Sequence, residues 1–257
     1  MLMAVDVGNT HITLGIFDGE LLIFYNRFST DSKRTEDEFA AMLLYLLSVE
    51  SINHKNIKML IISSVVPSIT VMFKRFSMRY LSIEPIIVDV GIKTGIILRF
   101  ENPKEIGADR IVNAVAVDRY FGVPAIVVDF GTATTFDIIN EKREYIGGVI
   151  TPGIEIMAIA LHLKTAKLPE VEISKIDTIV GKNTINSIKS GIYYGYLSMI
   201  DGIIDRIIDE QKFDTTILKV VATGGLGDIF LNDSKHMKIY DPYLTLNGLR
   251  LIYEKNN

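Results

Sequence analysis

The strongest constraint on the fold is a pattern that occurs twice. Leu2–Thr10 reads LMAVDVGNT, and Ala125–Thr134 reads AIVVDFGTAT. Each is an apolar run followed by Asp, one further residue, Gly and a cluster of small polar residues. Both patterns then resume an alternating apolar character, in Ile12–Phe17 and Thr135–Ile139, as a returning strand does. The sequence therefore predicts two copies of a β-hairpin, each with a carboxylate at the end of its first strand.

Such a hairpin suits the binding of a phosphate group and its metal ion. Glycine lets the backbone approach a ligand closely, and backbone N–H groups with hydroxyls can surround phosphate oxygens while the Asp faces a cation. A single D-x-G is commonly no more than a turn after a strand. The duplication favours the phosphate–metal interpretation, whose candidate residues are Asp6, Gly8, Asn9 and Thr10 in the first hairpin and Asp129, Gly131, Thr132, Ala133, Thr134 and Thr135 in the second.

The order of the expected elements also repeats. Each half reads as a three-strand meander followed by alternating helices and strands, which predicts an α/β protein of two stacked halves, residues 1–122 and 123–257, with a nucleotide cleft between them. The expected helices are Thr35–Val49, Ile69–Tyr80, Gly107–Tyr120, Ile154–Leu163, Ser187–Gln211 and Leu244–Tyr253. The expected strands beyond the two hairpins are Leu21–Phe28, Lys58–Ser64, Pro85–Asp89, Gly95–Phe100, Glu144–Ile150 and Ile217–Thr223.

Composition excludes several classes of protein. With 48% apolar and 23% charged residues among 257, the chain is expected to fold around a substantial core. A net charge of −4 gives no reason to expect nucleic acid, and the absence of cysteine excludes disulfides and thiolate chemistry. No stretch approaches the roughly 20 apolar residues of a membrane helix, and no signal-peptide pattern is present, so a cytoplasmic protein without a membrane partner is expected.

A second candidate site is the segment Asn102–Arg110, which reads NPKEIGADR. Asn102-Pro103 indicates a turn, and Gly107 permits a close approach just before a helix. Asp109 in a first helical turn is explained equally well by the helix dipole or by a role as general base toward a substrate hydroxyl. In the second case Arg110 would hold an anionic group of the substrate.

The remaining patterns are weaker. The run Ala222–Gly227, ATGGLG, is expected to join a strand to a following helix. It would let a base or ribose lie on the backbone of Gly224 and Gly225, although glycine-rich strand ends are frequent. Gly191 and Gly195 in the long helix indicate either close packing or subunit association. The four histidines lack metal-ligand spacing; His11 alone follows a phosphate-type hairpin.

Taken in order, the motifs resemble type III pantothenate kinases, which belong to the acetate and sugar kinase/Hsc70/actin superfamily. The resemblance rests on D-x-G-N-T at Asp6–Thr10, S-S-V-V-P at Ser63–Pro67, N-P-x-x-x-G-A-D-R at Asn102–Arg110, D-x-G-T-A-T-T at Asp129–Thr135, G-G-x-I-x-P-G at Gly147–Gly153, T-A-x-L-P at Thr165–Pro169, G-K-N-T at Gly181–Thr184 and T-G-G at Thr223–Gly225. The match spans almost the whole chain, and the combination of G-A-D-R, T-A-x-L-P and G-K-N-T is more specific than any single motif.

The resemblance implies transfer of the γ-phosphoryl group of ATP to the primary hydroxyl of pantothenate, the first step towards coenzyme A. It further implies Mg²⁺, a monovalent cation such as K⁺ or NH₄⁺, and a homodimer. By the same resemblance, Asp109 is the catalytic base, and Asp129 serves the monovalent cation. The other implied roles are phosphate and Mg²⁺ binding by Asp6, a phosphate contact by Thr132, and substrate contacts by Gly107, Ala108, Arg110 and the second subunit's Thr184.

One position departs from the family pattern. Many family members place Tyr shortly before the N-P turn as a pantothenate contact, whereas this chain has Phe100, which keeps the apolar contact and lacks the hydroxyl. Two alternatives stay open: another small-molecule kinase of the superfamily, and a non-catalytic accessory factor for transcription. The intact Asp6, Asp109 and Asp129 favour an enzyme, and the acidic balance disfavours direct DNA binding.

Overall fold

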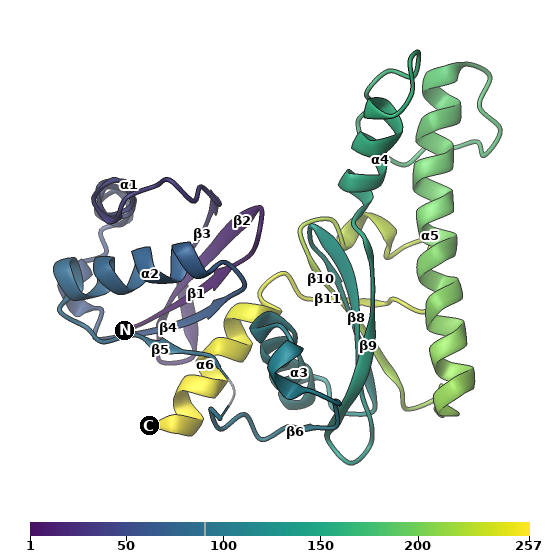
Figure 1. Ribbon diagram of the computed structural model, residues 1–257. Coiled ribbons are helices and arrows are strands. Elements are labelled where there is room, and N and C mark those ends of the chain that lie inside the picture. Colours follow the sequence, from purple (N-terminus) through teal and green to yellow (C-terminus); the bar gives the residue numbers. More distant parts are fainter. Residues whose placement is uncertain (90) are drawn as a thin grey trace. The chain divides into compact units, whose positions relative to one another are not determined.

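The computed structural model describes residues 1–89 and 91–257 and divides into two compact units. Unit 1 comprises Met1–Ile96, Phe100–Ala116 and Tyr243–Asn257, and unit 2 comprises Ile97–Arg99 and Val117–Pro242 (Figure 1). The predicted halves 1–122 and 123–257 describe the repeat of the sequence pattern and stay a prediction. The compact units are composed differently, because the last helix packs in unit 1.

Unit 1 is built on a five-stranded sheet in the order β3-β2-β1-β4-β5. Its strands are β1 (Leu2–Val7), β2 (His11–Asp18), β3 (Leu21–Ser29), β4 (Met59–Ser64) and β5 (Ile86–Ile87). The first three form an antiparallel meander, while β4 and β5 join parallel to β1. Asp6, the last but one residue of β1, lies opposite Thr13 on β2 and Ser63 on β4.

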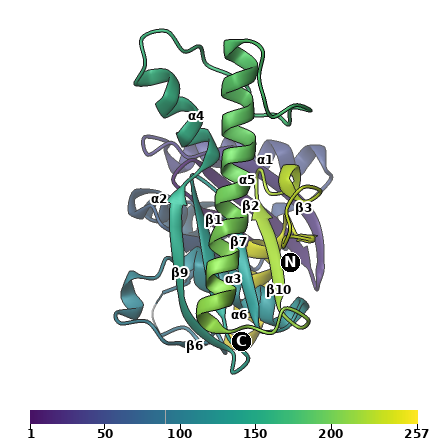
Figure 2. The same ribbon diagram turned by 90° about the vertical axis from the view of Figure 1, so that its right-hand side faces the viewer.

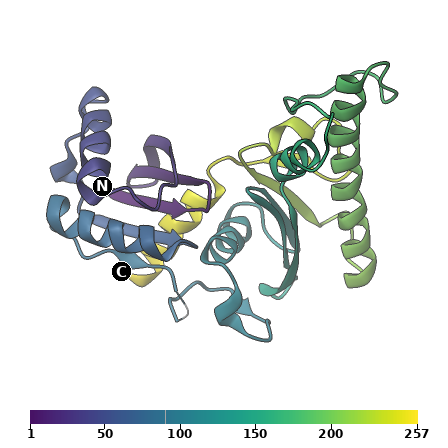
Figure 3. The same cartoon turned by 45° about the horizontal axis from the view of Figure 1, so that its top comes forward.

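Two helices cover one face of this sheet, α1 (Glu36–Val49) and α2 (Pro67–Phe76), with a π-turn at Ser77–Leu81 (Figure 3). Thr35 caps α1 in a capping box with Glu38, which satisfies two backbone donors at the helix start. Alternate residues of β1, β2 and β4 pack under them with Phe39, Phe73 and Phe76. The opposite face is covered by α6 (Leu244–Asn256): Leu246 abuts Gly15, whose neighbours Leu14 and Ile16 point to the other side.

Unit 2 repeats the arrangement. Its sheet has the order β11-β10-β7-β8-β9-β6, with β7 (Ala125–Phe130), β8 (Ala133–Ile139), β9 (Glu144–Pro152), β10 (Lys219–Gly224), β11 (Ile239–Tyr240) and β6 (Ile97–Leu98). Strands β7, β8 and β9 form the meander, and β10 and β11 run parallel to β7. Asp129 lies opposite Thr135 on β8 and Thr223 on β10, so it occupies the place that Asp6 has in unit 1.

The long helix α5 (Thr184–Gln211) lies along one face of this sheet (Figure 2). Its buried stripe includes Ile192, Tyr196, Ile200 and Ile204, packed on apolar residues of β7 and β8. The first turns of α5 pack beside α4 (Ile154–Leu163), beyond the sheet (Figure 1). Among the described residues, no helix is long and apolar enough to cross a membrane.

Most predicted elements are confirmed, with four differences. The helix expected after the glycine-rich segment is only the 3₁₀ turn η4 (Asp228–Phe230). The strands expected at Pro85–Asp89 and Gly95–Phe100 are only the two residues of β5 and of β6, and β11 was not predicted. Helix α3 (Ala108–Tyr120) follows two further 3₁₀ turns, η1 (His54–Asn56) and η3 (Pro103–Glu105).

Candidate active site

The first hairpin leaves its polar residues accessible. Asp6 and Gly8 are partly buried at the end of β1, whereas Asn9 and Thr10 are exposed in the loop. The loop is shaped by hydrogen bonds from the Gly8 N–H to the His11 carbonyl, at 2.9 Å, and from the Thr30 hydroxyl to the Gly8 carbonyl, at 2.7 Å. Thr30 also donates its backbone N–H to the Thr10 carbonyl, at 2.9 Å. Thr30, the residue after β3, therefore helps to fix the conformation of the loop.

The second hairpin is similar but one residue shorter, since Asp129 pairs with Thr135 whereas Asp6 pairs with Thr13. Asp129 is partly buried at the end of β7, and Gly131 and Thr132 are exposed in the loop. The Gly153 N–H donates to the Thr132 carbonyl at 3.0 Å, which ties the loop to the start of α4. A side chain at 153 would collide with the carbonyls of Gly131 and Thr132, so this close approach requires glycine.

Gly224 closes the space beside Asp129. Its φ of +89° lies in the left-handed region that favours glycine. A Cβ at this position would lie 2.6 Å from both the Asp129 Oδ1 atom and the Phe130 carbonyl oxygen. The Tyr240 hydroxyl donates to the Gly224 carbonyl at 2.8 Å and holds this turn, and Gly225 beyond it is exposed. Only glycine therefore allows this close approach of the backbone to Asp129 and Phe130.

Two neighbouring threonines of β8 point to opposite faces of the sheet. Thr134 is fully buried, and its hydroxyl is hydrogen-bonded to Tyr196 of α5. Any contact between Thr134 and a phosphate would therefore have to use its main chain. Thr135 lies opposite Asp129, on the other face, where its hydroxyl donates to Asp137 Oδ2 at 3.2 Å.

Asp137 and Tyr145 were not singled out from the sequence. Both are fully buried, and the Tyr145 hydroxyl donates to Asp137 Oδ1 at 2.8 Å. The available signal was an acid inside the otherwise apolar strand end TFDII, since buried carboxylates are rare unless they are hydrogen-bonded.

The segment G-A-D-R forms the start of α3 in unit 1. Asp109 is partly buried in the first helical turn, and its Oδ1 accepts the Arg110 N–H at 2.9 Å. Burial raises the pKa of Asp109 above its ordinary value, while this hydrogen bond and the Arg110 charge act in the opposite direction. A side chain at Gly107 would collide with the Asp109 carboxylate, which places Gly107 directly beside the candidate base. The guanidinium-bearing Arg110 is itself buried.

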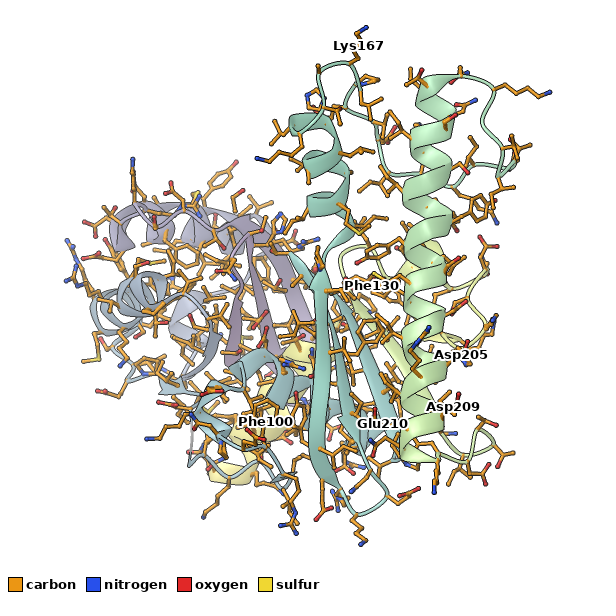
Figure 4. All side chains as sticks on the ribbon, turned by 45° about the vertical axis from the view of Figure 1, so that its right-hand side comes forward. Phe100, Phe130, Lys167, Asp205, Asp209 and Glu210 are labelled. Carbon is orange, nitrogen blue, oxygen red and sulfur yellow. The ribbon has the colours of Figure 1, made fainter. Side chains whose placement is uncertain are left out.

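The other proposed substrate contacts lie elsewhere in their units. Phe100 is partly buried in the loop before η3 of unit 1 (Figure 4). Ala108, the residue before Asp109, is also partly buried. Thr184 is exposed at the first turn of α5, where Asn183 caps the helix by accepting the Asn186 N–H at 2.9 Å. It lines a cavity of about 730 Å³ between α4 and α5, with Met157, Leu161, Lys182 and Ile188 among its walls.

The fit of a cation is limited by the ligands present. Within residues 1–89 and 91–257, no group of three or more His, Cys, Asp or Glu side chains could hold a metal ion. Among these residues, at most two such side chains could ligate a cation at either hairpin, with the remaining oxygens coming from hydroxyls, carbonyls or a phosphate. Such oxygen ligands suit Mg²⁺ shared with a nucleotide and K⁺, and they do not suit a transition metal.

Solved structures place the fold among sugar kinases and actin-like ATPases with duplicated halves. A conserved putative Baf family transcriptional activator from Campylobacter jejuni aligns with a TM-score of 0.62 at 19% identity, covering 99% of this chain and 98% of the other. A putative 2-dehydro-3-deoxygalactonokinase from Sinorhizobium meliloti aligns with a TM-score of 0.56 at 11% identity, covering 99% and 96%. At such low identity these likenesses define the class of fold alone.

Sequence relatives define the family within that class. The family model of type III pantothenate kinase matches residues 2–206. A type III pantothenate kinase of Bacillus cytotoxicus is 48% identical over 256 residues, covering 100% of this chain and 97% of the relative. The chain therefore belongs to the type III pantothenate kinase family.

Proposed function

We propose that this chain transfers the γ-phosphoryl group of ATP to the primary hydroxyl of pantothenate, forming 4'-phosphopantothenate in the first step of coenzyme A biosynthesis. Family membership over the whole chain supports the substrate and the reaction. The structural observation that carries the proposal is the partly buried Asp109 beside Gly107, with its pKa raised by burial. A carboxylate with a raised pKa is a better proton acceptor near neutral pH than an ordinary one.

In this proposal Asp109 orients the pantothenate hydroxyl and accepts its proton as the oxygen attacks the γ-phosphorus. Phosphoryl transfer depends mainly on positioning and charge neutralisation, so a single base with well-placed ligands suffices. Arg110 supplies a fixed positive charge for the pantothenate carboxylate. Gly107, Ala108 and Phe100 provide the surrounding contacts, and Phe100 can contribute apolar area without a hydroxyl.

The hairpins bind the phosphates and their cations. Asn9 and Thr10, both exposed, would bind phosphate oxygens, and Asp6 would hold Mg²⁺, which neutralises charge on the phosphates when bound. Gly131 and Thr132 do the same in unit 2, where Asp129 holds a monovalent cation, K⁺ or NH₄⁺. The exposed backbone of Gly224 and Gly225 offers a surface for the nucleoside.

A homodimer is also part of the proposal. Helix α4 exposes Ile156, Ile159 and Leu163, and the following segment exposes Ile179 and Val180, with 42 to 75% of each residue accessible. Contiguous exposed apolar residues of this kind mark interaction surfaces. A second copy would cover them and supply its own Thr184. Light scattering should give a dimer for the native chain and a monomer for Leu163→Glu; a native monomer would remove this part of the proposal.

The test of the reaction is ATP consumption with and without pantothenate, in Mg²⁺, with K⁺ and with Na⁺ only. We expect turnover that requires pantothenate and K⁺. Turnover with a hexose in place of pantothenate would identify a different acceptor. Folded protein without turnover on either substrate would contradict the kinase proposal.

A further inference from the structure

The polar side chains behind Asp129 form a hydrogen-bond network that has no role in the kinase reaction proposed above. Tyr145 donates to one oxygen of Asp137 at 2.8 Å, and Thr135 donates to the other at 3.2 Å. Asp137 and Tyr145 are fully buried, whereas Thr135 is partly exposed. The hydrogen-bond network therefore runs from the interior of unit 2 to the surface beside Asp129, and Thr135 is its outermost residue.

Strand register places Thr135 next to Asp129. The two residues are direct partners across β7 and β8, so their side chains share a face of the sheet. Directly opposed residues of antiparallel strands have Cβ atoms about 5 Å apart. A ligand held by the Asp129 carboxylate is thus within reach of the Thr135 hydroxyl.

The direction of the hydrogen bond decides what the hydroxyl can bind. A threonine hydroxyl has one hydrogen to donate and two lone pairs to accept with. The hydrogen of Thr135 is directed to Asp137, whose two oxygens each accept a hydroxyl. Only lone pairs are then left for the side of Asp129. Phosphate oxygens are acceptors and gain nothing from such a group, whereas a cation does.

We infer that Thr135 is a direct ligand of the monovalent cation at Asp129, and that Asp137 and Tyr145 are positioning residues that keep its hydroxyl in the accepting orientation. The inference rests on the proposed function for the presence of this cation. The close packing of Gly224 brings further oxygen atoms to this place, since a Cβ at Gly224 would collide with both Asp129 Oδ1 and the Phe130 carbonyl oxygen, which therefore lie close together. Carboxylate, hydroxyl and carbonyl oxygens are the ligands that hard cations prefer.

The experiment measures cation binding without turnover. Thermal unfolding is followed during titration with KCl in the presence of Mg²⁺ and ADP, with tetramethylammonium chloride keeping the ionic strength constant. A ligand that binds the folded state alone raises the melting temperature with a half-saturation set by its Kd. The half-activating K⁺ concentration for pantothenate-dependent turnover is measured on the same variants.

Thr135→Val should abolish the K⁺-dependent rise, and Thr135→Ser should restore it. Asp137→Asn and Tyr145→Phe should each raise the half-saturating K⁺ concentration, the former on the order of 10-fold, as expected for groups that orient a metal ligand. Thr151→Val is the matched control. Thr151 lies on the next strand opposite Thr134, hence on the α5 face, and donates to the Thr134 carbonyl at 3.4 Å. It should titrate as the native protein does.

Native-like K⁺ titration of Thr135→Val would overturn the inference, and so would a native protein that K⁺ does not stabilise. A native protein that K⁺ stabilises but that fails to phosphorylate pantothenate would contradict the proposed reaction and leave the cation ligand in place. The two proposals can therefore fail separately.

Discussion

The hairpins β1–β2 and β7–β8 share one framework, but the second loop is one residue shorter and a different residue stands behind it. Asp6 pairs with Thr13 as Asp129 pairs with Thr135. Two residues further along the returning strand, however, unit 1 has Gly15 and unit 2 has Asp137. Gly15 is packed against Leu246 of α6, which leaves no room there for a carboxylate.

We infer from this difference that the two halves of a duplicated framework can acquire different ligand preferences. The threonine of the second hairpin directs its hydrogen to Asp137. The threonine of the first faces a glycine at the same place, so no carboxylate at that position takes its hydrogen. We therefore expect the Thr135 hydroxyl to accept toward a cation and the Thr13 hydroxyl to donate toward a phosphate oxygen, while the loops of both hairpins bind phosphate as proposed.

We expect the largest effect on activity from a residue in which the helices α3 and α6 differ. The first turn of α3 carries Asp109, whereas α6, which follows the strands of the second half, has no acid in its first turn. Asp109→Asn should lower kcat by about 10²- to 10⁴-fold, the usual contribution of a general base, measured as pantothenate-dependent ATP consumption. An unchanged circular dichroism spectrum would show that the fold is kept. Near-normal turnover would remove Asp109 from the mechanism.

The next effect concerns the space beside Asp129. Gly224→Ala should cost about 1–3 kcal/mol in backbone strain, and it should also abolish K⁺-dependent stabilisation, because the new methyl group meets two oxygens. Gly122→Ala is the control. Its φ of +84° implies similar strain, yet nothing lies within 4 Å of the added carbon. If both variants lose K⁺ binding equally, backbone strain explains the loss, and the contact of the new methyl group with the two oxygens does not.

The variant Thr13→Val tests whether the two threonines differ in K⁺ binding. We expect it to leave the half-saturating K⁺ concentration unchanged, in contrast to Thr135→Val, because no carboxylate stands at position 15. The measurement is the same KCl titration of the melting temperature. Loss of K⁺ binding in Thr13→Val would mean that the hairpins do not differ as described.

The smallest expected effect is that of Asp109→Asn on the melting temperature. Burial raises the pKa of Asp109 in the folded state above its ordinary value of 3.8, so the folded protein keeps the proton at pH values where the unfolded chain has lost it. The stabilising contribution is therefore complete below the unfolded pKa and is lost as the pH rises through the folded pKa. Asp109→Asn should melt at the native temperature or slightly above it at pH 7.

Asp214→Asn gives the opposite sign as a control. Hydrogen bonds from Thr216 lower the pKa of Asp214, so its contribution is present above the unfolded pKa and is lost as the pH falls through the folded pKa. This variant should melt slightly below the native protein at pH 7 and approach it in acid. A lower melting temperature of Asp109→Asn than of the native protein at pH 7 would contradict a raised pKa of Asp109.

Local patterns were sufficient to predict most elements. The apolar runs before Asp6 and Asp129 predicted both hairpins, and α1 begins within one residue of its expected start. Strands β6 and β11 depend on pairing with distant strands, which two-residue segments cannot signal locally. Motifs identified the candidate base and both loops, but Asp137 and Tyr145 required the register of β8 and β9, since their hydrogen bond connects side chains from two strands.

The packing of α6 in unit 1 has a consequence for how the protein is made. Unit 1 begins with the first strand of the chain, yet one face of its sheet is covered by Leu246 and its neighbours, which the ribosome adds only after all of unit 2. Domains synthesised first usually fold first. Here the earlier unit has to wait for the later one, with apolar residues of β1 and β4 uncovered in the meantime. Chaperone dependence during synthesis should therefore concentrate on unit 1.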